Sequence, residues 1–210
     1  MIQVHRSSEP KILRRHRTSW THALLNAPTR AENRKREKKY RHREIKDALV
    51  EMFHGNCAYC ESKISHIDYG HIEHFRPKSQ FRSLTFEWTN LLLACPVCNG
   101  PEYKGQHFPE EAEGGPLINP CEDKPTEHFD FVFDSEAMLT TVVGKTTRGK
   151  TTEKMLGLNR NELRAYRTRI IAMLYALAFH AETDPYAKQL LDEARKADSE
   201  YSAFTSVFSL

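Results

Sequence analysis

Two Cys-x-x-Cys pairs constrain this chain more than any other feature of its sequence. Cys57 and Cys60 form the first pair, and Cys95 and Cys98 form the second after 34 intervening residues. In a reducing compartment disulfides are rare, and two such turns can grip one tetrahedral zinc ion. Four thiolates leave no open coordination position, so we expect structural zinc. The alternative is four ordinary buried cysteines. The fifth, Cys121, stands apart and is expected to be a buried small side chain.

The segment between the two pairs carries residues suited to chemistry. Glu73 directly precedes His74, which puts a hard oxygen ligand beside a titratable base. On a strand, neighbouring side chains point to opposite faces, so this pair must lie at a bulge or a strand end to share one site. Asn99 offers a further oxygen. Oxygen ligands with open positions suit magnesium or manganese, which predicts a second, catalytic metal site.

Length and composition limit the class of protein. The chain has 210 residues, 39% hydrophobic and 28% charged, as is typical of one compact domain with an extension. Its longest apolar run, residues 170–179, is too short for a membrane span, and the charged first twenty residues indicate no secretory signal, so we expect a cytoplasmic protein. Residues 1–50 hold 14 Lys or Arg against 5 Asp or Glu, which makes this end the expected anion-binding end.

Periodicity predicts the elements. We expect an arm over residues 1–27 with a short helix near 20–25, and one long helix over 29–53 that Gly55 ends. The charged run 30–43 is either a solvated helix face or a basic rail for phosphates. Short strands and turns should fill 56–104, with a helix opening near Asn99. A hairpin is expected within 129–143, then helices, one of them opened by Asp184-Pro185, and apolar residues over 201–208. The apolar tail 203–210 either packs in the core or covers a partner.

These residues together resemble the HNH nucleases, in particular those with a zinc-stapled ββα-metal fold. The matching positions, in order, are Cys57, Cys60, Glu73-His74, Asn90-Leu91, Cys95, Cys98-Asn99 and Lys104. More narrowly, the chain resembles the HNH subunit of the Septu anti-phage defence system, which is also found beside retrons. That likeness covers roughly residues 45–165 and rests on CAYCE, IEHFRPK, WTNLLLACPVCN, Phe108-Pro109, LINPCED and LGLNR.

The resemblance implies a role for each matching residue. His74 would be the general base that activates water, and Glu73 and Asn99 would hold the catalytic divalent ion. The Asn90 amide would fix the loop and the imidazole. Phosphate contacts are implied for Arg76, Lys78 and Lys104. The chain departs from the commonest pattern because Glu73 replaces an Asp, and Asn99 stands where many members have His. His71 and His107 are open candidates for the metal shell, or else surface residues.

The resemblance also implies an architecture and a partner. We expect an α+β protein with a basic N-terminal arm and helix (1–44), an HNH nuclease core with its zinc site (45–110), a loop and hairpin extension (111–150) and a C-terminal helical region (151–210). Its function would be hydrolysis of DNA or RNA phosphodiesters in defence against phage, with an ABC or SMC-like ATPase as the partner that uses ATP. The alternative is a non-catalytic, zinc-dependent nucleic-acid-binding or adaptor subunit.

Overall fold

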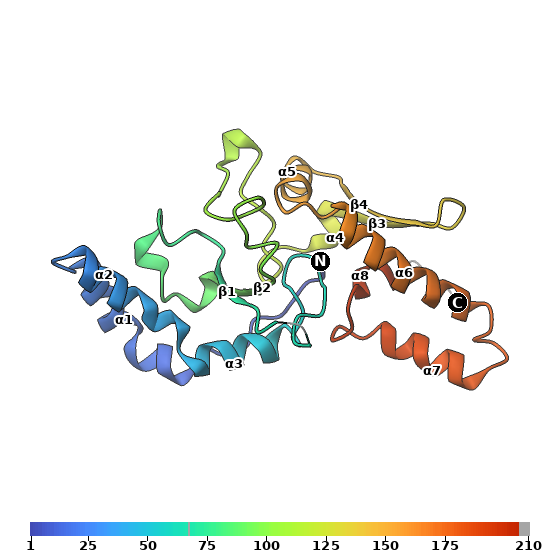
Figure 1. Cartoon of the computed structure of the whole chain (residues 1–210), viewed down its shortest axis with the longest axis horizontal. Helices are drawn as coiled ribbons and strands as arrows, with labels where there is room; N and C mark the ends of the chain where they lie inside the picture. The colour runs from blue at the N-terminus through green and yellow to red at the C-terminus, as the bar shows by residue number, and fades with distance from the viewer. Residues whose placement is uncertain (67, 206–210) are drawn as a thin grey trace. The chain divides into compact units, whose positions relative to one another are not determined.

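The computed structural model describes residues 1–66 and 68–205 (Figure 1). The chain forms two compact units. The N-terminal unit comprises Val4–Cys57 and Ile64–Phe108, and the C-terminal unit comprises Met1–Gln3, Ala58–Lys63 and Pro109–Leu210. Each unit is described by itself below.

Helices make up the first half of the N-terminal unit. They are α1 (Lys11–Leu25), α2 (Arg30–Glu37), the 3-10 turn η1 (Lys38–Arg41) and α3 (Arg43–Met52), with α1 and α2 side by side (Figure 1). The expected short helix in the arm is thus longer and begins at Lys11. The Thr29 hydroxyl caps α2 by accepting a hydrogen bond from the Glu32 amide at 3.1 Å.

The prediction of a single long helix over residues 29–53 is wrong, because the helical path is interrupted at His42. This residue has an extended ψ of 138°, and its ring then accepts a hydrogen bond from the Glu44 amide as α3 begins. The apolar face predicted for the second half is present, with Ile45, Leu49 and Met52 buried. Tyr40, just before the break, is also buried. The break therefore lets η1 and α3 bury different faces.

A short hairpin forms the second half of this unit. Strand β1 (His71–His74) pairs antiparallel with β2 (Leu91–Ala94), and His71 lies opposite Ala94 while His74 lies opposite Leu91. Every residue of β2 is buried, which anchors the hairpin in the core. The connection contains the 3-10 turns η2 (Arg82–Leu84) and η3 (Trp88–Asn90).

The helix expected to open near Asn99 is replaced by a series of turns. Residues 99–106 are linked by bonds such as Tyr103 N to Gly100 O and Lys104 N to Cys98 O. Gly105 has a φ of +46°, in the left-handed region that favours glycine, which ends any regular helical path.

The C-terminal unit contains a second hairpin and the remaining helices. After η4 (Glu111–Glu113) and α4 (Pro125–His128), β3 (Phe129–Asp134) pairs antiparallel with β4 (Leu139–Gly144), which confirms the predicted hairpin. Then follow α5 (Thr147–Met155), α6 (Asn161–Ala178), α7 (Pro185–Ala194) and α8 (Ser202–Thr205). As predicted, Asp184 caps α7 through the Tyr186 amide at 2.8 Å.

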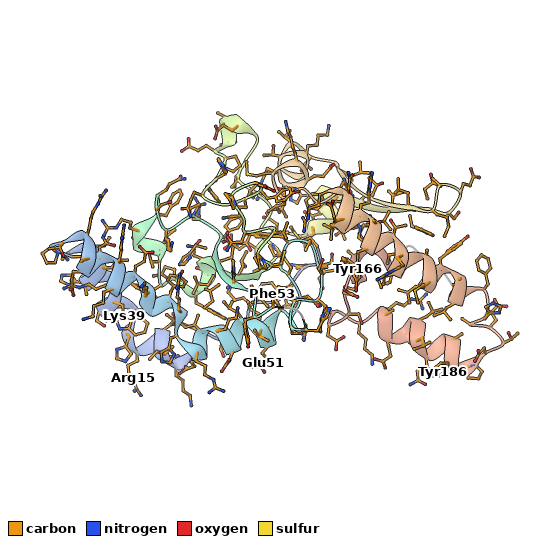
Figure 2. The ribbon with its side chains drawn as sticks, viewed as in Figure 1. Arg15, Lys39, Glu51, Phe53, Tyr166 and Tyr186 are labelled. Atoms are coloured by element: carbon orange, nitrogen blue, oxygen red, sulfur yellow. The ribbon has the colours of Figure 1, made fainter. Side chains whose placement is uncertain are left out.

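Helices α6 and α7 lie side by side (Figure 1). The buried side of α6 carries Leu163, Arg167 and Ile171, whereas Tyr166 and the α7 residue Tyr186 are exposed (Figure 2). Residues 206–210 of the predicted apolar tail lie outside the described residues; those of α8 are buried. Mixed helices with two small sheets confirm the α+β class. Among the described residues, no helix combines the length and the apolar character needed to cross a membrane.

Candidate active site and metal sites

The end of β1 presents Glu73 and His74 to one small hollow. His74 is the last residue of the strand, and beyond it the Phe75 amide still bonds to the Asn90 carbonyl at 2.9 Å. The register is regular, so a strand end rather than a bulge lets the two neighbours share a site. Both line a hollow of about 90 Å³ together with Asn99.

The imidazole of His74 is held from two sides. It is 6% exposed, its Nε2 lies 3.0 Å from the carbonyl oxygen of Thr85, and the Tyr40 ring meets it edge-on at 4.7 Å between centroids. A carbonyl only accepts, so the neutral ring carries its hydrogen on Nε2 and its lone pair on Nδ1. Burial, aided by the positive charges of Lys78 and Lys104, lowers the pKa of His74 from 6.5 to about 4.

Asn90 braces the chain that follows His74. Its Oδ1 accepts a hydrogen bond from the Arg76 amide at 2.8 Å, and its Nδ2 donates to the carbonyls of Arg76 at 3.0 Å and Leu84 at 3.2 Å. Asn90 is itself buried. These three backbone bonds tie η2 to the end of β1, which is the geometry that a loop-fixing amide requires.

Glu73 has a buried cationic partner. Its carboxylate forms an ion pair with Lys104, whose side chain has no exposed surface and which also donates to the His74 carbonyl at 3.0 Å. The family resemblance implies that Lys104 contacts phosphate. In the structure the Lys104 amine is buried between one side-chain acceptor, the Glu73 carboxylate, and one backbone acceptor, the His74 carbonyl. The buried carboxylate needs this compensating charge.

Asn99 lies at the rim of the same hollow and touches a further histidine. Its Nδ2 is 3.2 Å from His71 Nδ1, and it is half-buried. His71 is exposed at the start of β1, whereas His107 is exposed and does not line the hollow. Among the described residues, no group of His, Cys, Asp or Glu ligands forms here as it does at the cysteines. His71 lines the neighbouring hollow together with Asn99.

Two further cations lie close to His74 in the chain, and one of them, Lys78, lines the hollow. Lys78 pairs with Glu37 of α2 at 3.2 Å. The Arg76 guanidinium lies 4.7 Å from the centroid of the Phe108 ring and 5.4 Å from that of Phe81. Both are half-buried, so their charges remain close to water and to an incoming anion.

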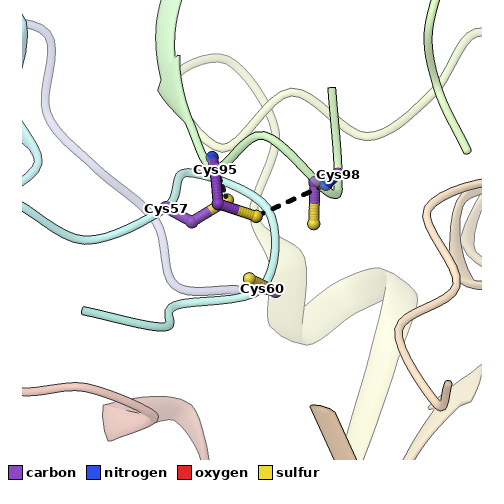
Figure 3. A group of neighbouring side chains, drawn as sticks. All are labelled: Cys57, Cys60, Cys95 and Cys98. Carbon is purple, nitrogen blue, oxygen red and sulfur yellow. Dashed lines mark hydrogen bonds between the residues drawn. The ribbon is translucent and has the colours of Figure 1, made fainter. Parts of the chain in front are cut away.

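The four paired cysteines converge on one point (Figure 3). The sulfurs of Cys57, Cys60, Cys95 and Cys98 all lie within 4.8 Å of one another. Backbone amides support the cluster, since the Cys95 amide bonds to Cys57 Sγ and the Cys98 amide to Cys95 Sγ, each at 3.3 Å. Sulfurs around a tetrahedral zinc are about 3.8 Å apart, given Zn–S bonds of about 2.3 Å, so this donor set fits zinc. Cys121 lies outside the cluster and is half-buried.

Tyr40 is the site residue that sequence reasoning missed. It touches His74 and lines the hollow, and its hydroxyl accepts a hydrogen bond from Arg41 Nε at 3.2 Å. It is the only Phe, Trp or Tyr in the charged run 30–43. A lone aromatic residue inside such a run was the signal that this helix turns one side chain toward the core.

One further spacing, overlooked in the sequence, fits a phosphate-binding loop. Gly144, Gly149, Lys150 and Thr151 match G-x-x-x-x-G-K-T. In the structure, however, α5 begins at Thr147, and the Gly149 and Lys150 amides bond to the side chain and carbonyl of Thr146. A Cβ on Gly149 would lie 2.2 Å from the His128 carbonyl oxygen. Close packing thus explains this glycine, and the amides serve the helix start rather than a phosphate.

Comparison with known proteins agrees with this geometry. The HNH endonuclease family matches residues 57–105. A Septu protein PtuB of Bacillus mycoides (strain KBAB4) is 31% identical over 201 residues, which cover 81% of this chain and 67% of that protein. Another Septu protein PtuB, of Bacillus thuringiensis, is 36% identical over 128 residues, covering 60% of this chain and 46% of that protein.

A third relative carries a different name. A Septu protein PtuA of Bacillus mycoides (strain KBAB4) is 27% identical over 177 residues, or 70% of this chain and 24% of that protein. The match to the first PtuB extends well beyond the cysteines and the hairpin, across most of both chains. The chain therefore belongs to the Septu PtuB family and carries an HNH endonuclease domain.

Proposed function

We propose that the protein is a metal-dependent endonuclease that hydrolyses phosphodiester bonds of nucleic acid. One observation carries the proposal: His74, Glu73 and Asn99 line a single hollow, and the His74 ring is oriented there by the Thr85 carbonyl. A base, a carboxylate and an amide oxygen in one place are the groups that metal-assisted hydrolysis needs.

His74 would act as the general base. Because Nε2 is used by the Thr85 carbonyl, Nδ1 is the atom that accepts a proton from water. The oxygen of that water attacks phosphorus, and the bond from phosphorus to the leaving oxygen breaks on the opposite side. Asn90 and Tyr40 keep the ring in place, so little motion is needed when the proton moves.

Glu73 and Asn99 would hold a magnesium or manganese ion. Their carboxylate and amide oxygens fit a hard cation that keeps several water ligands. Such an ion neutralises charge on the phosphate and on the leaving oxygen. Lys104 orients the Glu73 carboxylate through its ion pair. Lys78, which lines the hollow, and Arg76, two residues after His74, are the proposed phosphate contacts.

The biological role proposed is that of a nuclease in anti-phage defence, supported by the PtuB relatives. An ATPase of the ABC or SMC-like type is the proposed partner, which the match to a protein named PtuA supports. Action of the complex in the cytoplasm and an association with retrons stay predictions from the sequence resemblance.

Cleavage assays test the proposal directly. Plasmid DNA and total RNA would be incubated with magnesium and the wild type, His74→Ala or the control His107→Ala. Each protein would be tested alone and together with the proposed ATPase partner. We expect the wild type and the control to cleave, and His74→Ala to lose at least about a hundredfold in rate. His107 is exposed and outside the hollow, so its loss should change little. No cleavage by the wild type in any combination would favour the adaptor alternative, whereas equal cleavage by all three proteins would exclude His74 as the general base.

A further inference from the structure

Three hollows of the N-terminal unit adjoin one another and lead away from His74. The first is the small hollow around His74. The second, of about 480 Å³, shares Tyr40, Ile72 and Asn99 with the first. The third, of about 450 Å³, shares Arg41 with the second. Because each hollow shares lining residues with the next, they are neighbours on the surface, and we call the three together the η1 tract because η1 contributes to each of them.

The η1 tract is lined by cations that form no salt bridge within the described residues, although Glu37 interacts electrostatically with Arg41. The third hollow is bordered by Lys38, Lys39 and Arg41, together with His42 and Trp20. No carboxylate in the described part of the chain pairs with any of these three cations. In contrast, their neighbours Arg36 and Arg43 pair with Glu32 and Asp47.

The ordinary explanation of a charged helix does not account for this pattern. On a solvated face, cations pair with carboxylates three or four residues away, as Arg36 and Arg43 do. The three η1 cations instead line the third hollow, namely Lys38, Lys39 and Arg41. Their charges are therefore available to a ligand that binds in this hollow. A polyanion is the ligand that gains most from such a surface.

An aromatic residue lies at the far end of the tract. Trp20 of α1 lines the third hollow and is half-buried. Its ring stacks on His16, with 5.3 Å between centroids and 7° between planes, and Lys39 Nζ lies 5.3 Å from its centroid. Cations beside an indole are the combination that binds a single strand, because phosphates pair with the cations and a base stacks on the ring.

We propose that the η1 tract binds the nucleic-acid strand that flanks the scissile phosphate. Backbone phosphates lie on Lys38, Lys39 and Arg41, and an unpaired base contacts Trp20. The inference rests on the proposed nuclease function and deepens it, because it assigns the substrate path and favours a strand that is unpaired near the cut. The N-terminal helices are then part of the substrate site.

A matched pair of double variants tests the phosphate contacts. Lys38→Gln with Lys39→Gln removes two charges from the tract, and Arg34→Gln with Lys35→Gln removes two exposed charges of α2 that line none of the hollows. Affinity for a labelled single-stranded oligothymidylate would be measured over a salt series without added divalent ion. The slope of log affinity against log salt should become shallower by about 1.4 in the first variant, since each phosphate contact to a single strand contributes about 0.7. It should change much less in the control.

Tryptophan fluorescence tests the base contact. The chain has two tryptophans, and Trp88 is buried, so stacking on Trp20 should quench the wild type on addition of the oligonucleotide. Trp20→Phe keeps an aromatic ring against Phe86 and should abolish the quenching. Tight binding without quenching would overturn the base contact.

The two proposals fail separately. If the wild type cleaves nucleic acid but both double variants show the same salt slope, the η1 tract is not the substrate path and the nuclease function stands. If the tract variant alone changes the slope but the wild type cleaves nothing in any combination, the tract binds nucleic acid and the nuclease function is lost.

Discussion

At the scale of single residues, the orientation of Glu73 and His74 depends on the side chains and carbonyl groups around them. His74 is oriented by a carbonyl on one side and by the edge of Tyr40 on the other. Glu73 is neutralised by Lys104, and the same lysine holds the backbone of His74. The reactive groups are therefore fixed by neighbours that come from η1 and from the turns after Cys98.

Tyr40 should act as a positioning residue for His74. Tyr40→Phe removes only the hydroxyl bonded to Arg41 and keeps the ring edge, so cleavage should stay close to that of the wild type. Tyr40→Leu removes the edge contact and lets the imidazole turn, which should lower kcat on the order of tenfold to a hundredfold with little change in KM. Single-turnover cleavage would measure both. A loss in Tyr40→Phe as large as in Tyr40→Leu would assign the effect to the hydroxyl instead.

Lys104 should contribute mainly to stability. Lys104→Met would leave the buried Glu73 carboxylate without its partner, which we expect to cost about 3–5 kcal/mol in the free energy of unfolding. If Glu73 ligates a divalent ion, added magnesium should restore part of this loss, since the ion replaces the missing charge. Urea unfolding with and without magnesium would measure both effects. Lys63→Met, which changes a half-buried lysine of the C-terminal unit, is the control.

At the scale of elements, sequence patterns predicted elements whose apolar spacing is regular. The hairpin β3–β4, the Asp184 cap and the face of α3 all have local causes and were predicted. The break at His42 was not predicted, because the sequence there contains no Gly or Pro that would end a helix. The break depends instead on the burial of Tyr40. A helix opening near Asn99 was predicted after Cys98, but turns form there instead. Gly100, Gly105 and the tight turn of the cysteine pair disfavour a regular helix in this segment.

The same distinction holds for the site. The resemblance to HNH nucleases pointed to Glu73, His74, Asn90 and Asn99. Glu73, His74 and Asn99 line one hollow, and Asn90 braces the chain beside it. The lone aromatic residue in the charged run marks Tyr40 as core-facing, but its contact with His74 and the η1 tract join segments far apart in sequence, which no local pattern encodes. Burial of Lys104 likewise follows from its acidic partner 31 positions earlier.

Helix α5 should hold the LINPCED segment in place through one side chain. Arg148 forms a double ion pair with Asp123 at 2.8 and 2.9 Å, and it donates to the carbonyls of Pro116 and Leu117. Arg148→Gln should lower the free energy of unfolding by about 2–3 kcal/mol, because a charged acceptor loses its partner. Lys150→Gln, on the same helix and exposed, should be near neutral. Chemical denaturation would measure the free energy of unfolding of both variants. Equal values would show that the LINPCED segment keeps its position without Arg148.

At the scale of the whole molecule, the chain divides its tasks between two units. The N-terminal unit holds the hairpin, the Glu73-His74 pair and the basic helices. Positions 1–50, which include the η1 residues, hold 14 basic and 5 acidic residues. The remaining 160 residues hold 17 basic and 23 acidic residues. Positive charge is thus concentrated where a polyanionic substrate is proposed to bind.

The β1–β2 hairpin should depend on bound zinc for its stability. Cys57 precedes β1 and Cys95 follows β2, so an ion bound by the cluster would close the chain around the hairpin that carries Glu73 and His74. A short two-stranded hairpin is marginal by itself, and a structural zinc supplies folding free energy directly. Loss of the ion should therefore disorder the catalytic hairpin as well as the cysteine turns.

Elemental analysis and thermal unfolding of two cysteine variants test this dependence. The wild type should contain one zinc per chain, and Cys98→Ser should lose it and unfold at a markedly lower temperature. Cys121→Ser removes the one cysteine outside the cluster and should keep both the zinc and the stability. A zinc chelator should lower the unfolding temperature of the wild type and of Cys121→Ser, but not that of Cys98→Ser. Wild-type protein purified without zinc, with a chelator having no effect, would instead assign the four cysteines to the core as ordinary buried thiols, and the hairpin would then need another source of stability.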